Sequence, residues 1–306
     1  MFRWRLVVGT ALIALLVVLC WADHYCPVPG VVLLPLVVVI CLLGTAEFLA
    51  LVKTAGVCCS TWPVYVGNIA ILLAAWVPGL VWGSCQQSGP GQSIGTEALS
   101  AAHGWLLWTL AGALILLMLE EIRHFTGPGG IVARLGTSSL GLLYVGFLLS
   151  FLVLLRMGYG IKALASVVIV VKMADTAAYF VGHLFGRRKL APQLSPGKTI
   201  EGTLGGLLGA WAASWAVFTW LTPALSPCAE PYNPTAAAWW AWTSYGLVLG
   251  LVGLGGDLAE SLLKRDAGRK DSSQWMPGLG GVLDLMDSLL WSAPVAYLWW
   301  HRGWVQ

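Results

Sequence analysis

The sequence predicts an all-α, polytopic integral membrane protein with about nine transmembrane helices. Hydrophobic residues make up 58% of its 306 residues and charged residues only 10%, whereas soluble domains carry about 25% charged residues. The mean hydropathy of +0.78 agrees with this class. The 18 tryptophans agree as well, because Trp concentrates at the two interfaces of a bilayer.

Nine apolar stretches approach the roughly 20 residues that a spanning helix needs. They are Leu6–Ala22, Val31–Val52, Trp62–Trp82, Gly104–Leu119, Ser138–Leu155, Ala163–Leu184, Gly202–Leu221, Ala236–Gly255 and Val282–Trp300. The short link Met157–Gly160 separates the fifth stretch from the sixth. The first stretch is interpreted as a retained helix, because no small-residue cleavage site follows it. Gly83–His103 is expected to be an exposed outer connector.

Basic residues gather on one side of this topology. Thirteen of the 17 Lys and Arg lie in the N-terminal pentapeptide or in the second, fourth, sixth and eighth loops. Because basic loops stay in the cytoplasm, we expect the N-terminus inside and the C-terminus outside. The basic residues form no solvated face of the kind that binds nucleic acid.

The seven cysteines predict neither a zinc site nor a redox motif, because none of them forms a CxxC pair. Cys85 and Cys228 fall in two loops that are expected outside, so a disulfide between them stays open. The other cysteines are expected to be small apolar fillers.

Ionisable side chains gather where the eighth span ends. On a helix, Asp257, Ser261 and Lys264 are spaced so that they share one face, and Arg265 follows directly. Charges at a span are energetically costly and usually face a partner or a wet cavity. We therefore expect a polar site at the inner membrane face.

The eighth loop continues through Lys270-Asp271-Ser272-Ser273 and the glycine turn Pro277–Gly281 to Asp284 and Asp287 of the ninth span. Carboxylates beside Lys and Arg suit a magnesium ion on a phosphate substrate, because magnesium prefers oxygen ligands. Plain structural ion pairing within this cluster stays open as the alternative.

The sixth loop, Gly186–Glu201, contains Ser195-Pro196-Gly197-Lys198-Thr199. This segment is not interpreted as a P-loop, because Pro192 stands where the earlier glycine belongs and no preceding strand is expected. A glycine turn that carries Lys198 can still bind phosphates through backbone N–H groups.

Two further groups of charges lie inside spans. Lys172 and Asp175, three residues apart and followed by Tyr179, form either a structural ion pair or part of a site. Glu47, near the inner end of the second span, is a weaker candidate of the same kind.

These residues resemble the signature of a family. Ser261-Leu-Leu-Lys264-Arg265, Lys270-Asp271-Ser272-Ser273, Pro277-Gly278-x-Gly280-Gly281 and Asp284-x-x-Asp287-Ser288 are similar to the long motif of phosphatidate cytidylyltransferases, the CDP-diacylglycerol synthases. Asp175-Thr-Ala-Ala-Tyr179, the Ser195–Gly202 loop and Glu47-Phe48 resemble the family's other recurrent stretches. Leu279 and Leu285 depart from it, because the family has His and Arg at those places.

The resemblance implies that CTP and phosphatidate react to CDP-diacylglycerol and pyrophosphate. It implies a homodimer in the bacterial inner membrane, with a site open to the cytoplasm and to the membrane lipid. Magnesium would bind Asp257 and Asp284, and a second, monovalent cation stays open. The expected catalytic residues are Asp257, Lys264, Asp284 and Asp287. The expected substrate-binding residues are Ser195, Lys198, Thr199, Ser261, Arg265, Lys270, Asp271 and Asp175.

We expect one membrane domain over residues 1–306, with N-terminal helices over 1–160 and the catalytic helices and inner loops over 161–306.

Three other functions stay open. A CTP-dependent polyprenol kinase would release CDP instead of pyrophosphate, and a divergent CDP-lipid synthase would use another acceptor. A transporter would place its charges near the midplane of the bilayer on broken helices.

Overall fold

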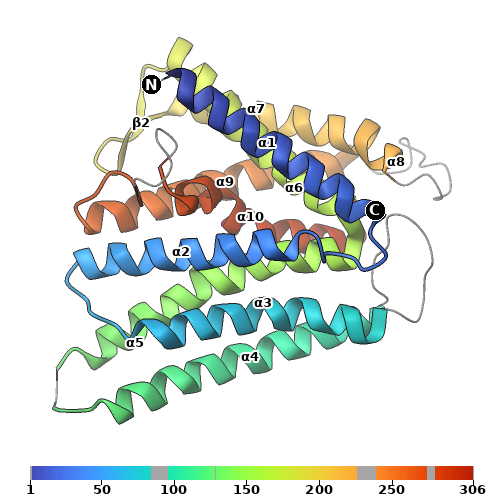
Figure 1. Ribbon diagram of the computed structural model, residues 1–306. Helices are drawn as coiled ribbons and strands as arrows, with labels where there is room; N and C mark the ends of the chain where they lie inside the picture. Colours follow the sequence, from blue (N-terminus) through green and yellow to red (C-terminus); the bar gives the residue numbers. More distant parts are fainter. Residues whose placement is uncertain (1, 84–95, 128, 226–238, 274–279, 306) are drawn as a thin grey trace. The chain divides into compact units, whose positions relative to one another are not determined.

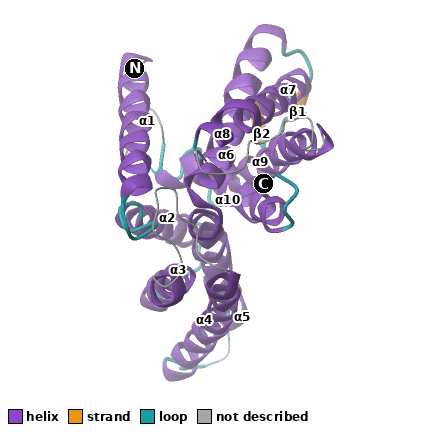
Figure 2. Ribbon diagram, turned by 90° about the vertical axis from the view of Figure 1, so that its right-hand side faces the viewer, coloured by secondary structure: helices purple, strands orange, loops and turns teal. Residues whose placement is uncertain are grey.

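The computed structural model describes residues 2–83, 96–127, 129–225, 239–273 and 280–305. This part of the chain is helical except for one short β-hairpin (Figure 2). Its elements, labelled in Figure 1, are α1 (Phe2–Tyr25), α2 (Leu34–Thr54), α3 (Thr61–Gly83), α4 (Thr96–Arg123), α5 (Ile131–Gly141), a π-helical turn (Leu142–Phe147), α6 (Leu148–Phe185), β1 (Lys189–Ala191), β2 (Ser195–Thr199), α7 (Ile200–Ala216), a second π-helical turn (Val217–Leu221), α8 (Thr222–Ala224), α9 (Trp239–Asp266) and α10 (Val282–His301). Leu279, Cys85 and Cys228 lie outside the described residues, so the expectations for them stay predictions.

The all-α membrane class is confirmed, whereas the count of nine spans stays a prediction. Seven helical segments in the described part are long and apolar enough to cross a bilayer. One of them, Ile131–Phe185, has 55 residues and covers both the fifth and the sixth expected spans. Its helical geometry breaks at Gly160, where φ is 78° and ψ is −173°. This break lies in the link that the sequence placed between the two spans.

Two local expectations are wrong. The segment Gly83–His103, expected to be an exposed outer connector, already contains the first two turns of α4. Its Ala and Leu residues favour helix, and the side chains of Ala98 and Ala102 are buried. The sixth loop does contain strands, since β1 pairs antiparallel with β2. Gly197 and Lys198 lie within β2, so the segment is a hairpin strand and not the loop between a strand and a helix.

The chain forms two compact units. The first consists of Met1–Gly158 and Leu263–Met286, and the second of Tyr159–Leu262 and Asp287–Gln306. Each unit thus combines segments that are distant in sequence, and the two units divide α9 and α10 between them. The expected single membrane domain, with N-terminal helices over 1–160 and catalytic helices over 161–306, stays a prediction.

In the first unit, α3 packs along α4, and α2 lies beside α3 (Figure 1). A buried ion pair joins the end of α1 to the part of α6 before its break, with Arg156 Nε 2.6 Å from Asp23 Oδ2. The Asp23 carboxylate also accepts the backbone N–H groups of Gly30 and Val32. The end of α1 is therefore fixed, although only 6% of its apolar stretch is buried.

In the second unit, small residues let helices approach closely. A side chain at Gly205 or Gly209 of α7 would collide with Val181 or Ala177 of α6. Gly250 of α9 lies in the same way against α7. Such small-residue contacts are the usual packing of membrane helices, because they bring backbones together without a cavity.

Candidate functional site

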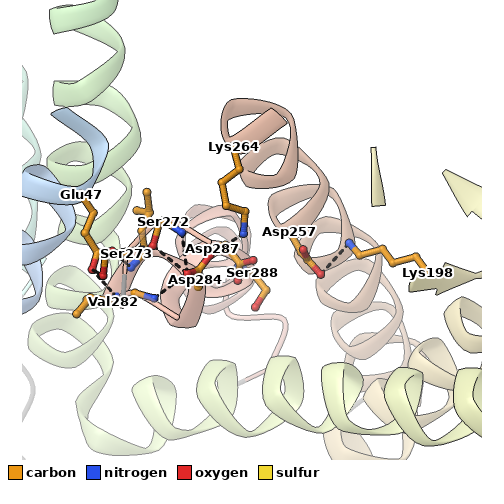
Figure 3. A network of polar contacts seen from close by, with 12 residues as sticks. Glu47, Lys198, Asp257, Lys264, Ser272, Ser273, Val282, Asp284, Asp287 and Ser288 are labelled. Atoms are coloured by element: carbon orange, nitrogen blue, oxygen red, sulfur yellow. Dashed lines mark hydrogen bonds and ion pairs between the residues drawn. The ribbon is translucent and has the colours of Figure 1, made fainter. Parts of the chain in front are cut away.

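Polar side chains in the first unit surround the N-terminus of α10. We call Glu47, Lys264, Ser272, Ser273 and Asp284 the helix-cap cluster (Figure 3). The first backbone N–H groups of any helix lack partners inside the helix. Here the Glu47 carboxylate accepts those of Val282 at 3.0 Å and Leu283 at 2.8 Å.

Asp284 is engaged from several directions. Its Oδ1 lies 2.6 Å from Lys264 Nζ, and both side chains are only 12% exposed. Its Oδ2 accepts the backbone N–H groups of Gly281 at 2.7 Å and Ser272 at 3.1 Å. A carboxylate at the third helical position that binds the capping N–H is half of a capping box. Asp284 is therefore a structural cap, whatever else it binds.

The second unit contains a separate group of acids and lysines, in which side chains from α6, β2, α9 and α10 take part. We call Lys172, Asp175, Lys198, Asp257, Asp287 and Ser288 the lysine–carboxylate cluster. Lys172 Nζ lies 3.2 Å from both Asp175 Oδ2 and Ser288 Oγ. Ser288 in turn donates to Asp175 at 3.0 Å. Lys172 and Asp175 thus form the expected pair, and Ser288 connects it to α10.

Lys198 and Asp257 meet in the same unit, although 59 positions separate them in the sequence. Lys198 Nζ lies 2.8 Å from Asp257 Oδ2, as Figure 3 shows. The Lys198 side chain is 17% exposed and that of Asp257 is 39% exposed, so water and small ions reach the carboxylate. Gly256 packs on the backbone carbonyl of Asp287, and Asp287 interacts electrostatically with Asp257.

The hairpin that carries Lys198 is fixed on both sides. Thr199 is the N-cap of α7, and its hydroxyl accepts the N–H of Gly202 at 3.1 Å. The Glu201 carboxylate accepts the backbone N–H groups of Arg187 and Arg188. The Thr199 hydroxyl, expected at the substrate, therefore stabilises the start of a helix, and its substrate contact stays a prediction.

The remaining predicted residues occupy varied positions. Ser195 begins β2 opposite Ala191, and Ser261 is buried in α9. Arg265 is exposed at the end of α9, and Lys270 and Asp271 are exposed in the following turn. Their predicted contacts with the substrate stay predictions.

Sequence reasoning did not assign functions to Ser272, Ser273 and Ser288, and it ranked Glu47 low. The three serines stand inside the quoted family motif, so the motif contained the signal. Nothing in the sequence connects Glu47 with Ser272, because 225 positions separate the two residues.

Magnesium fits the residues of the second unit. Among the described residues, no group of three or more His, Cys, Asp and Glu forms a metal cage. Magnesium does not need one, since it takes one or two carboxylates and completes its shell with phosphates and water. Asp257 and Asp287 supply such oxygen donors. Asp257 and Asp284 belong to different units, so their assignment to one magnesium ion stays a prediction.

Known proteins resemble the chain over most of its length. Residues 3–301 match the model of the cytidylyltransferase family. The phosphatidate cytidylyltransferase of Pseudomonas aeruginosa is 42% identical over 199 residues, which are 64% of this chain and 67% of that protein. The one from Synechocystis sp. is 30% identical over 285 residues, 83% of each chain. The one from Chlamydia pneumoniae is 33% identical over 201 residues, which cover 63% of this chain and 62% of that relative.

Proposed function

The chain belongs to the cytidylyltransferase family, and from this premise we propose that it transfers the cytidylyl group of CTP to phosphatidate. The products are CDP-diacylglycerol and pyrophosphate. The names of the relatives from Pseudomonas aeruginosa and Synechocystis sp. support this reaction. The observation that carries it is the Lys198–Asp257 pair, in which a cation from the hairpin and a carboxylate of the apolar helix α9 meet.

In this reaction an oxygen of the phosphatidate phosphate forms a bond to the α-phosphorus of CTP. The bond from that phosphorus to the oxygen bridging to the β-phosphorus breaks, and pyrophosphate leaves with the electron pair. The attacking oxygen is already anionic at neutral pH, so no strong base is needed. The difficulty is repulsion, since two unit charges 4 Å apart repel by about 4 kcal/mol at an effective dielectric constant near 20.

The lysines and acids offset this repulsion by exchanging partners. Lys198 and Lys172 each bind a carboxylate, and each can bind a phosphate oxygen in its place. Asp257, once released from Lys198, offers its oxygens to a divalent cation, with Asp287 beside it. Magnesium, when bound, would neutralise triphosphate oxygens and stabilise the leaving pyrophosphate. Lys264 and Arg265 remain the proposed phosphate contacts at the end of α9.

Placement and assembly are part of the proposal. We assign the chain to the inner membrane of a bacterium, with the N-terminus and the reaction on the cytoplasmic side. The excess of Lys and Arg in the even-numbered loops supports this orientation. The homodimer and the second, monovalent cation are proposed from the family resemblance alone.

The test uses purified protein, magnesium, phosphatidate and CTP labelled either at the α- or at the γ-phosphate. We expect the α-label in the lipid product and the γ-label in pyrophosphate. A CTP-dependent kinase would instead place the γ-label in the lipid, with polyprenol as acceptor. Label transfer only from the γ-position, or no CDP-lipid with phosphatidate, would contradict the proposal.

A further inference from the structure

We propose that Glu47 is a positioning residue for the reaction. Its carboxylate holds the N-terminus of α10 and the Ser272–Ser273 turn, and through them it sets the position of the Asp284 carboxylate. The proposal concerns contacts inside the first unit. Its activity arm rests on the proposed function and on the prediction from the sequence that Asp284 is a magnesium ligand, whereas its structural arm rests on neither.

Four donors converge on the Glu47 side chain. Figure 3 labels Ser272, Ser273 and Val282, which supply three of them. Oε1 accepts the hydroxyl of Ser273 at 2.8 Å and the N–H of Val282 at 3.0 Å. Oε2 accepts the hydroxyl of Ser272 at 3.0 Å and the N–H of Leu283 at 2.8 Å. Each oxygen therefore takes one hydroxyl and one backbone donor. A carboxylate has about four acceptor positions, and all of them are used here.

The surroundings favour a charged acceptor at this place. Glu47 is only 7% exposed, and burying an unpaired charge is costly. The unpaired N–H groups at a helix N-terminus carry a partial positive charge, which stabilises an anion there. Glu47 supplies that anion to α10 from a different helix, α2.

The contact passes directly to Asp284. The Ser272 hydroxyl, which is 3.0 Å from Glu47 Oε2, is also 2.9 Å from Asp284 Oδ2, so both carboxylates share its one hydrogen. Gly281 lies between the two acids, because a side chain there would collide with the Glu47 carboxylate and with Ser272. A shift of Glu47 therefore displaces Asp284 through a single shared hydroxyl.

Two substitutions separate acceptor chemistry from packing. Glu47→Gln keeps the size of the side chain, but its NH₂ group faces a backbone N–H donor whichever way the amide is turned. Glu47→Asp is shorter, but it keeps both acceptor oxygens. If Glu47 acts by accepting hydrogen bonds, the Glu47→Asp protein should keep more turnover and more protection from exchange than the Glu47→Gln protein. If it acts by filling space, the order is reversed.

Glu120→Gln is the matched control. Glu120 lies in the same unit and is also 7% exposed. Its Oε1 accepts hydrogen bonds from Trp62 and Ser60, far in sequence from the α10 terminus. We expect this variant to keep wild-type turnover and wild-type protection of residues 280–287.

The experiment measures amide hydrogen exchange of residues 280–287 and CDP-lipid formation per folded protein, across a magnesium titration. For Glu47→Gln we expect exchange at Val282 and Leu283 to rise about tenfold or more, as for a lost hydrogen bond to a charged group. We expect turnover to fall and the magnesium concentration for half-maximal turnover to rise. Loss of folded protein alone would not move that concentration.

Three results would overturn the proposal. They are unchanged exchange in Glu47→Gln, raised exchange with unchanged turnover and magnesium dependence, and equal effects in Glu120→Gln. If the wild-type protein forms no CDP-lipid, the proposed function fails by itself. The exchange measurement would then still decide whether Glu47 holds the terminus of α10.

Discussion

Asp257, inside α9, and Asp284, in the first turn of α10, are both acids of apolar helices, but their surroundings differ. Asp284 is 12% exposed and accepts from Lys264, Ser272 and Gly281. Asp257 is 39% exposed and pairs with Lys198. The first is built into the structure, whereas the second is accessible to a ligand.

This difference predicts that two substitutions affect stability to different extents. Asp257→Asn should lower magnesium-dependent turnover by about 10²- to 10³-fold, as for the loss of one electrostatic group at a reacting phosphate. Its stability should change by less than about 1 kcal/mol, because the lost ion pair is partly exposed. Asp284→Asn should lower the stability by about 3–5 kcal/mol, because it removes the carboxylate charge from the largely buried Lys264–Asp284 ion pair.

Thermal unfolding in detergent and turnover of labelled CTP measure the two effects separately. Asp266→Asn is a suitable control, because Asp266 is exposed at the end of α9 and has no predicted contact with the substrate. An Asp257→Asn protein with near wild-type turnover would contradict the assignment of Asp257. An unchanged melting temperature for Asp284→Asn would contradict its structural function.

The sequence predicts the arrangement of site residues where those residues are close to one another in the chain. On a helix, Asp257, Ser261 and Lys264 were expected to share one face past the eighth span, and α9 does continue through all three residues to Asp266. The partners of these side chains were not predictable, since Lys198 joins Asp257 from a hairpin and Glu47 joins Ser272 from another helix. Such pairs depend on packing that no short segment contains.

At the scale of elements, α7 depends on small residues where it meets α6. Gly205→Ala should lower stability by about 1–3 kcal/mol, because the new methyl group collides with Val181 and overpacks the contact. Gly112→Ala on α4 is the matched control, since nothing lies within 4 Å of its would-be Cβ. That variant should be neutral or slightly stabilised, because Ala favours helix over Gly.

Chemical denaturation of the two variants in the same detergent tests this contact. Equal stability of both would mean that α7 does not depend on close approach at Gly205.

The helices themselves were predictable from apolar runs of spanning length. The β1–β2 hairpin was not, because its strands are only 3 and 5 residues long and contain a proline and a glycine.

At the scale of the whole molecule, the number of crossings decides on which side the chain ends. A continuous helix of 55 residues would be about 82 Å long, whereas the apolar core of a bilayer is only about 30 Å thick. We therefore expect the break at Gly160 to divide two crossings. We expect a reporter inserted at Gly160 and one at the C-terminus to be outside, and one in the 267–271 turn to be inside.

A pair of reporters, one active only outside the cell membrane and one only inside, measures these positions. A C-terminus on the inside would contradict an odd number of crossings. A cytoplasmic reporter at Gly160 would mean that Ile131–Phe185 does not divide there. Val282–His301 is not among the seven candidate spans of the described residues, so the ninth crossing stays a prediction that these reporters test.

The buried Asp23–Arg156 pair also has a consequence for how the protein is made. Arg156 follows Asp23 by 133 positions, so at 5–20 residues per second the ribosome needs about 7–27 s to supply it. During that interval the first inserted helix ends in an acid without its counter-ion. Nascent chains that stop before Arg156 lack the ion pair that fixes the end of α1, so we expect them to be degraded faster. Slightly longer chains that include Arg156 should form the pair and persist.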